Sequence, residues 1–144
     1  MAYFEWNSDV ELGHAQIDDE HKRLFALAET VVEAFSSTAE PGPREALLRA
    51  LIDFAREHFA HEEALMRDSG YPDAQAHAKF HASLLAELET YCARVRMGSH
   101  TNPSGMIAYL WNWLTVHIHA ADRQLATWLS STPGPGVVAQ TVQK

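Results

Sequence analysis

The sequence predicts an all-α fold, namely an antiparallel up-down-up-down four-helix bundle that follows an N-terminal arm. Four segments carry apolar residues at helical spacing, short breaks separate them, and no segment shows the alternation typical of a strand. Short connections of this kind favour antiparallel neighbours in a bundle. With 144 residues, 47% of them hydrophobic and 21% charged, the chain has the size and composition of one globular domain. We assign residues 1–130 to this domain and residues 131–144 to a flexible C-terminal tail.

The first helix follows an arm, residues 1–17, whose aromatic side chains include Phe4 and Trp6. We expect these rings to cover one end of the core. Asp18 is the predicted N-cap, because its carboxylate would accept hydrogen bonds from backbone N–H groups of the first turn. A run rich in Ser, Gly and Pro at residues 36–43 ends the helix. The apolar positions at helical spacing are Leu24, Phe25, Ala28, Val31, Val32 and Phe35.

The second and third helices flank a turn at residues 68–73, which contains Ser, Gly and Pro. The second helix is predicted to begin at Pro43 or Arg44, because proline is accepted in a first turn. The third begins near Asp73, returns along the second and ends before Gly98. The predicted inward positions are Leu47, Leu51, Phe54, Ala55, His58, Glu62 and Leu65 on the second helix, and His77, His81, Leu84, Leu85, Leu88, Tyr91, Cys92 and Val95 on the third.

The fourth helix follows a polar break at residues 100–103 and extends to about Leu129. The segment beyond it contains Pro and Gly and is where we expect the flexible tail. The predicted inward positions of this helix are Ile107, Leu110, Trp111, Leu114, His117, Ile118, Ala121, Leu125 and Trp128.

Side chains that bind metal ions fall on these apolar stripes, and every helix contributes at least one. The pairs His58/Glu62 and His77/His81 each have the spacing that places two side chains on one face of a helix. A single inward histidine is more often a hydrogen-bonded core residue. An apolar core has no reason to accept so many polar groups, however, unless something shared satisfies them, and imidazole with carboxylate suits a transition metal. The candidate ligands are His21, His58, Glu62, His77, His81, His117 and Asp122.

The spacing between His117 and Asp122 is unusual for two ligands on one helix. Five positions correspond to ~140° of rotation in a regular α-helix, which would place the two side chains on different faces. We therefore predict an i→i+5 irregularity between these residues, as occurs at functional sites. The four histidines off the inward lines, which we expect to be exposed or to lie behind the ligands, are His14, His61, His100 and His119.

The order and spacing of these motifs resemble the hemerythrin family, and with Trp6 the resemblance covers residues 1 to about 129. It implies a four-helix bundle with a non-heme di-iron centre that binds O2 reversibly, and thus an oxygen-binding protein rather than an enzyme. The matching segments are Ile17-Asp18-Asp19-Glu20-His21, His58-Phe59-Ala60-His61-Glu62, His77-Ala78-Lys79-Phe80-His81 and His117-Ile118-His119-Ala120-Ala121-Asp122.

The resemblance also implies a role for each matching residue. One iron ion has three imidazole ligands and the other has two, so the second is one ligand short and O2 binds in that gap. Both carboxylates bridge the ions, together with an oxo or hydroxo group. By residue, His77, His81 and His117 hold one iron, His21 and His58 hold the other, Glu62 and Asp122 bridge them, and Leu24, Phe59, Trp113, Leu114 and Ile118 line the O2 pocket.

The bulk composition narrows the partners and the compartment. A formal charge of −8 opposes binding to nucleic acid or to an anionic membrane surface. No apolar run approaches the roughly 18 residues of a membrane span, and no signal peptide is visible at the start. The single Cys92 allows no internal disulfide. We therefore expect a cytoplasmic protein, and the resemblance implies O2 as its partner, with an O2-consuming enzyme as recipient.

Two other functions use the same ligands. One is a di-iron enzyme of the oxidase, peroxidase or nitric oxide reductase type. The other is a sensor module whose iron site reports O2 or iron to a partner. Reversible gain and loss of a visible absorption band on exposure to O2 separates oxygen binding from enzyme turnover.

Overall fold

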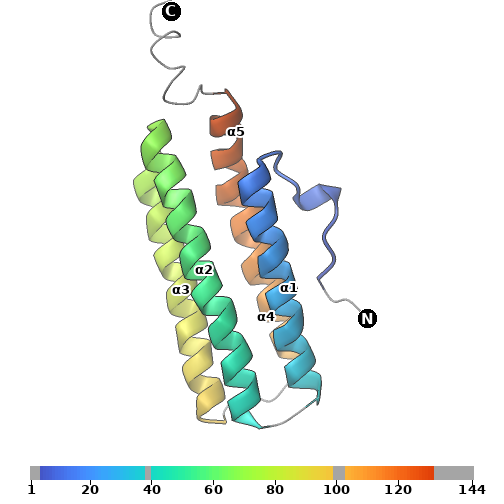
Figure 1. Ribbon diagram of the computed structural model, residues 1–144. Coiled ribbons are helices and arrows are strands. Elements are labelled where there is room, and N and C mark those ends of the chain that lie inside the picture. The colour runs from blue at the N-terminus through green and yellow to red at the C-terminus, as the bar shows by residue number, and fades with distance from the viewer. Residues whose placement is uncertain (1–3, 38–39, 99–102, 132–144) are drawn as a thin grey trace, which may run out of the picture.

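The computed structural model describes residues 4–37, 40–98 and 103–131, and it is a four-helix bundle, as predicted (Figure 1). No strand occurs in these three ranges. None of their helices has the length and apolar composition that crossing a bilayer requires. The elements are η1 (Ser8–Val10), α1 (Ala15–Ser37), α2 (Pro41–Ser69), α3 (Ala74–Arg96), α4 (Pro103–Val116), η2 (His117–Asp122) and α5 (Arg123–Ser131).

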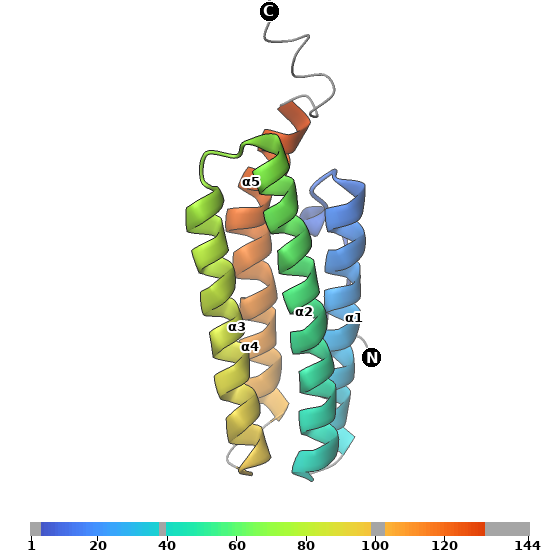
Figure 2. The ribbon, with the colours of Figure 1, turned by 60° about the vertical axis from the view of Figure 1, so that its left-hand side comes forward.

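The helices form four rods that lie side by side and alternate in direction, the fourth being the continuous run of α4, η2 and α5 (Figures 1 and 2). The helix α2 packs against α1 and α3, and α1 also packs against α4. Each rod sends apolar side chains to the centre. Leu24, Leu51, Leu88 and Leu110, one from each rod, have no exposed surface. Burial of a leucine side chain stabilises the fold by about 1.5–3 kcal/mol, so this shared core holds the four rods in register.

The start of α1 differs from the prediction, because the helix begins at Ala15 and not after Asp18. The Nδ1 atom of His14 accepts a hydrogen bond from the backbone N–H three residues later, at 3.3 Å. The Asp18 carboxylate lies inside the first turn and accepts from the N–H groups of Leu12, at 2.9 Å, and Gly13, at 3.1 Å. Asp18 therefore ties the incoming chain to the helix, and the predicted N-cap was wrong by one turn.

The N-terminal arm lies along the side of the bundle, not over its end as predicted (Figure 1). The backbone N–H of Phe4 donates to the Glu29 carboxylate at 3.0 Å, in the middle of α1. The Phe4 ring stacks on Trp111, with centroids 6.1 Å apart, and Trp6 packs edge-on against Phe25 at 5.4 Å. Trp111, predicted to point inward, is 42% exposed beneath this arm.

The helix α2 begins at Pro41, two residues earlier than predicted, and its buried stripe is wider. Leu48 and Ile52 have no exposed surface, whereas the predicted inward residues Leu47 and Phe54 are only partly buried. The reason is that α2 has neighbours on two sides, α1 and α3.

The turn between α2 and α3 is confirmed. Gly70 follows the last residue of α2 with φ 69°, a left-handed conformation that glycine adopts at little cost. The backbone N–H of Tyr71 donates to the carbonyl oxygen of Met66 at 2.9 Å and closes the helix end. Asp73 then directly precedes α3. These contacts turn the chain so that α3 runs back along α2.

The predicted irregularity in the fourth rod is also confirmed. Residues His117–Asp122 form a π-helical segment, η2, and the N–H of Arg123 donates to the carbonyl oxygen of Ile118, five residues earlier. An i→i+5 pattern is wider than an α-helix and brings residues five apart toward the same face. Asp122 is thereby fully buried, as are Ile118 before it and Leu125 after it.

Candidate metal centre

Six of the seven predicted ligands come together in the interior of the bundle. They belong to α1, α2, α3 and η2, and together they form two groups of four, each close enough to hold a metal ion. The seventh, His117, lies in η2, but its side chain is outside the described part of the chain, as are the His119 side chain and all of His100. The exposed fractions of the six are 0% for His21, His58, Glu62 and Asp122, 1% for His81 and 5% for His77.

The two oxygen atoms of Glu62 face different pairs of imidazoles. Its Oε2 lies 3.0 Å from Nε2 of His58 and 3.6 Å from Nε2 of His21. Its Oε1 lies 3.0 Å from Nε2 of His81 and 3.5 Å from Nε2 of His77. Glu62 therefore stands between a pair from α1 and α2 and a pair from α3.

Asp122 divides its oxygens between the same two pairs. Its Oδ2 lies 2.8 Å from Nε2 of His21, and its Oδ1 lies 2.9 Å from Nε2 of His77. Both groups thus contain Glu62 and Asp122, while each has two imidazoles of its own. The arrangement provides two neighbouring positions that share both carboxylates.

Carboxylates behind the cluster orient two of the imidazoles. The Nδ1–H of His58 donates to Oε1 of Glu20 at 2.7 Å, and the Nδ1–H of His81 donates to Oε2 of Glu63 at 2.9 Å. Glu20 has a second imidazole partner, His61, whose Nδ1–H donates to Oε2 of Glu20 at 2.6 Å. A carboxylate on Nδ1 fixes the proton there, so the lone pair that could bind a metal lies on Nε2, the atom that points into the cluster.

The electrostatics of the metal-free cluster point the same way. Burial lowers the pKa of His58, but hydrogen bonds with Glu20 and Glu62 outweigh this effect and raise the pKa to about 10. Burial likewise lowers the pKa of His77, while hydrogen bonds with Asp122 and Glu62 raise it to about 9. Burial raises the pKa of Glu62, yet hydrogen bonds with four imidazoles hold it well below its usual value. In the metal-free protein, protons on His58 and His77 therefore supply the positive charge that balances the Glu62 and Asp122 carboxylates.

The residues fit a pair of transition-metal ions. If the imidazoles are neutral, the Nε2 lone pairs of His58 and His81 face carboxylate lone pairs of Glu62 at 3.0 Å. Acceptors at that distance repel each other unless a proton or a metal cation lies between them. The two groups contain imidazoles and carboxylates and no cysteine, a donor set that suits iron and related ions.

The five residues predicted to line an O2 pocket are all buried in the apolar core. The Phe59 ring stacks on His81, with centroids 4.0 Å apart and an interplanar angle of 7°. Trp113 follows at 6.1 Å from Phe59, and its indole N–H donates to the carbonyl oxygen of Leu84 at 3.1 Å. An apolar wall therefore meets the cluster at His81. The exposed fractions are 0% for Leu24, Leu114 and Ile118, 1% for Phe59 and 2% for Trp113.

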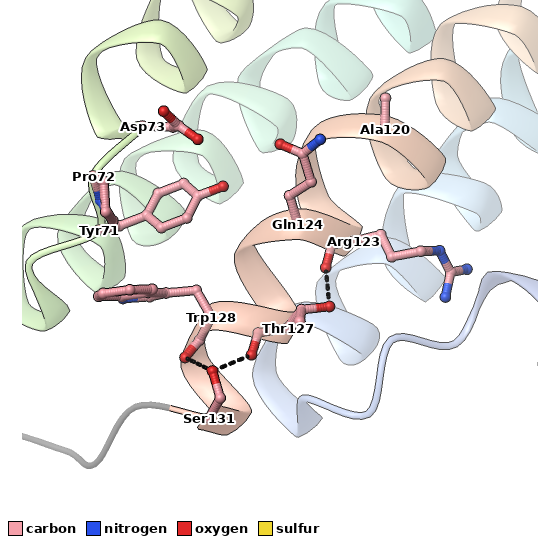
Figure 3. A pocket seen from close by; sticks show the side chains of 9 residues that line it. All are labelled: Tyr71, Pro72, Asp73, Ala120, Arg123, Gln124, Thr127, Trp128 and Ser131. Atoms are coloured by element: carbon pink, nitrogen blue, oxygen red, sulfur yellow. Dashed lines mark hydrogen bonds between the residues drawn. The ribbon is translucent and has the colours of Figure 1, made fainter.

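A surface cleft lies beside the cluster, between the α2–α3 turn and α5. Figure 3 shows Tyr71 and Trp128 on one side of it, while the Arg123 side chain extends away from them. The ring centroids of Tyr71 and Trp128 are 5.9 Å apart. The cleft has a volume of about 520 Å³. It adjoins a second one of about 470 Å³, which His77 lines. His77 is thus the cluster residue nearest to solvent among the six.

Sequence reasoning did not single out Glu20 and Glu63 as partners of the ligands. Each directly precedes or follows a predicted ligand, His21 or Glu62, so each is turned away from the inward line of its own helix. Their contacts are made to other helices, and helical periodicity carries no signal for such contacts. The hint available in the sequence was the adjacency of Glu20 to His21 and of Glu63 to Glu62.

The comparisons with known proteins agree with this geometry. The family model described as "Hemerythrin HHE cation binding domain" matches residues 12–129. The bacteriohemerythrin of Pseudomonas paraeruginosa is 30% identical over 122 residues, which cover 85% of this chain and 78% of that protein. A bacteriohemerythrin of Stenotrophomonas maltophilia is 29% identical, covering 88% and 81%, and a hemerythrin-like protein of Naegleria gruberi is 28% identical, covering 83% and 87%.

Solved structures show the same fold. A crystal structure of wild-type hemerythrin superposes with a TM-score of 0.78 at 25% identity, covering 88% of this chain and 97% of that one. A single-substitution mutant of hemerythrin gives a TM-score of 0.81, covering 90% and 99%. With a match over most of its length, a shared bundle and a buried cluster of histidines and carboxylates, the chain belongs to the hemerythrin family.

Proposed function

We propose that the chain binds two non-heme iron ions at this cluster and uses them to bind O2 reversibly, in oxygen storage, delivery or scavenging. The observation that carries the proposal is the way in which Glu62 and Asp122 share their oxygen atoms. Each carboxylate turns one oxygen to the His21/His58 pair and the other to the His77/His81 pair. Two shared carboxylates between separate imidazole pairs are suited to two adjacent metal ions, not to one.

The proposed ligand roles follow this division. In the proposal, the α3 pair and the α1–α2 pair each hold one ion, both carboxylates are shared, and His117 adds a third imidazole to one side only. The ion held by His21 and His58 would then have one ligand fewer than the other ion. Two iron ions, bridged by an oxo or hydroxo group, would supply the redox chemistry for holding and releasing O2. By residue, His77, His81 and His117 hold one ion, His21 and His58 hold the other, and Glu62 and Asp122 are shared.

The protein contributes a dry and confined surrounding. The side chains of Leu24, Leu114 and Ile118 have no exposed surface, and Phe59 covers one face of the His81 ring. We propose that these residues, with Trp113, line the O2 pocket, exclude water and reductants, and leave room for a diatomic molecule only. Exclusion of water strengthens the electrostatic interactions within the site.

The proposed partners follow from charge and chemistry. The formal charge of −8 disfavours nucleic acid and anionic membranes. From the proposed di-iron centre we propose O2 as the ligand and an O2-consuming enzyme as the recipient. We propose the cytoplasm as the location.

Metal analysis combined with oxygenation spectroscopy tests the proposed function. Purified protein is expected to contain two iron ions per chain, and its reduced form to gain a visible absorption band in O2 that disappears on purging and returns on re-exposure. Irreversible bleaching with formation of a product would instead indicate a di-iron enzyme. Protein that takes up no iron under reducing conditions would overturn the proposal.

A further inference from the structure

The carboxylate of Glu20 is held at both of its oxygen atoms by imidazoles from α2. His58 donates to Oε1 at 2.7 Å, and His61 donates to Oε2 at 2.6 Å. The His58 side chain is fully buried, that of Glu20 is 15% exposed, and that of His61 is 42% exposed. The three residues thus form a hydrogen-bonded chain from the interior of the cluster to the surface.

The corresponding contact on the other side of the cluster is weaker. His81 donates to Glu63 at 2.9 Å, and the Glu63 side chain is 39% exposed. Glu63 and His81 come from α2 and α3, whereas Glu20 in α1 meets two residues of α2. A carboxylate bonded through both oxygens cannot rotate away without breaking a hydrogen bond, while one with a single partner and more solvent contact is less restrained.

We propose that Glu20 and His61 are positioning residues that hold His58 in its metal-binding orientation and so set the rate at which the ion bound by His21 and His58 is lost. This inference rests on the proposed function. Partners behind a ligand imidazole fix its ring orientation and raise its basicity, and their mutation typically costs about 10- to 100-fold in metal affinity. The effect matters most on this side, where the proposed ion has only two imidazole ligands.

The role of His61 is separate from that of Glu20. His61 lies one residue before Glu62, but its ring points away from the cluster and toward Glu20. Its N–H keeps the second oxygen of Glu20 occupied at 2.6 Å, whereas the other donor to that oxygen, Nε2 of Gln16, lies at 3.5 Å, so His61 is the stronger restraint that leaves the first oxygen directed at His58. A side chain that retains an N–H donor at the same place should therefore replace it, whereas an apolar side chain should not.

The test is the time course of iron removal from the loaded, reduced full-length protein by the iron(II) chelator bathophenanthroline disulfonate. We expect two phases, of which the faster reports the ion held by His21 and His58. Glu20→Ala should accelerate the fast phase by about 10-fold or more and leave the slow phase unchanged. Glu63→Ala is the reciprocal variant and should accelerate only the slow phase. Asp19→Ala, an exposed carboxylate next to Glu20, is the matched control and should change neither.

Two substitutions at His61 separate positioning from general loosening of the bundle. His61→Leu removes the donor and should accelerate the fast phase, by less than Glu20→Ala does. His61→Asn keeps an N–H near the position of Nδ1 and should restore the rate of the unmutated protein. Identical release from Glu20→Ala and Asp19→Ala, or equal acceleration of both phases, would overturn the inference while the unmutated protein still binds iron and O2. An unmutated protein without iron would overturn the proposed function itself.

Discussion

At the residue scale, Glu62 is the side chain on which the most cluster contacts depend. Each of its oxygen atoms faces two imidazoles, and the side chain has no exposed surface. Its loss therefore affects both proposed metal positions at once.

The first prediction follows from this sharing. Glu62→Ala should lower the iron content from two ions per chain to less than one, because both positions lose an oxygen ligand. Glu57→Ala, which removes an exposed carboxylate from the same helix, is the control and should keep both ions. Elemental analysis of the purified variants gives the iron content. Two retained ions in Glu62→Ala would show that Glu62 is not a shared ligand.

Leu114 carries the second prediction at this scale. Its side chain is fully buried, and it is one of the residues proposed to keep water from bound O2. Leu114→Ala should shorten the lifetime of the oxygenated form, followed as decay of its visible band, because a cavity admits water. Leu110→Ala removes an equally buried leucine one turn away in α4.

Both leucine variants should lose stability by about 2–5 kcal/mol, the usual cost of such a truncation in a core. Only Leu114→Ala should speed the decay. Equal decay rates in the two variants would remove Leu114 from its proposed role and leave it as a core residue.

At the scale of the elements, the α2–α3 turn positions the α3 ligands relative to those of α2. Gly70 makes this turn with φ 69°. Gly70→Ala should lower the free energy of unfolding by about 1 kcal/mol, because an L side chain in the left-handed region costs about 1–2 kcal/mol. Gly42→Ala is the control in the first turn of α2, where no atom lies within 4 Å of the added Cβ apart from the two chain neighbours and the backbone of the helix itself.

Gly42→Ala should change the free energy of unfolding much less, because the helical preference of alanine over glycine, about 0.5–1 kcal/mol in a helix interior, is opposed by contact between the new Cβ and the ring of Pro43, the next residue. Urea denaturation of the metal-free protein measures both changes. A stabilising effect of Gly70→Ala would mean that the turn relaxes to another conformation.

The π-helical segment η2 acts at the same scale. It adds one residue to the turn between His117 and Asp122 and returns the rod to regular helix at Arg123. Without this extra residue in the turn, Asp122 would lie ~140° from the His117 position. The segment therefore places the Asp122 carboxylate between His21 and His77.

At the scale of the whole molecule, the cluster joins α1, α2, α3 and the fourth rod, so its charge state bears on global stability. Without metal, the pKa of His58 is about 10 and that of His77 about 9, both above the ordinary value of 6.5. A raised pKa in the folded state contributes stability that is complete below pH 6.5 and is lost as the pH rises through the folded-state pKa.

The last prediction follows from that sign. The metal-free protein should become less stable between about pH 7 and pH 10. Over this range the imidazoles of the folded state lose the protons through which they pair with Glu62 and Asp122. The iron-loaded protein should be more stable throughout this range and should show a flatter pH dependence, since metal ions replace the protons. Thermal unfolding of both forms at several pH values is the measurement. A metal-free protein whose stability rises with pH would contradict it.

Much of the fold and of the cluster could be predicted from local spacing. Apolar residues at helical intervals predict the helices of the bundle, the four-residue intervals predict that His58 pairs with Glu62 and His77 with His81, and the five-residue interval before Asp122 predicts η2. These features depend on the geometry of one helix at a time, which the order of residues determines.

Other features depended on how the helices pack against each other. The division of the Glu62 oxygens between two imidazole pairs, the double hydrogen bond of Glu20 and the position of Phe4 along the side of the bundle all join segments distant in sequence. Such contacts are decided by the rotation and spacing of whole helices, which arise from the sum of many core contacts. The sequence by itself therefore determined the helices and the pairs of ligands that share one helix face, whereas only the tertiary structure decided how deeply each residue is buried and which atoms meet.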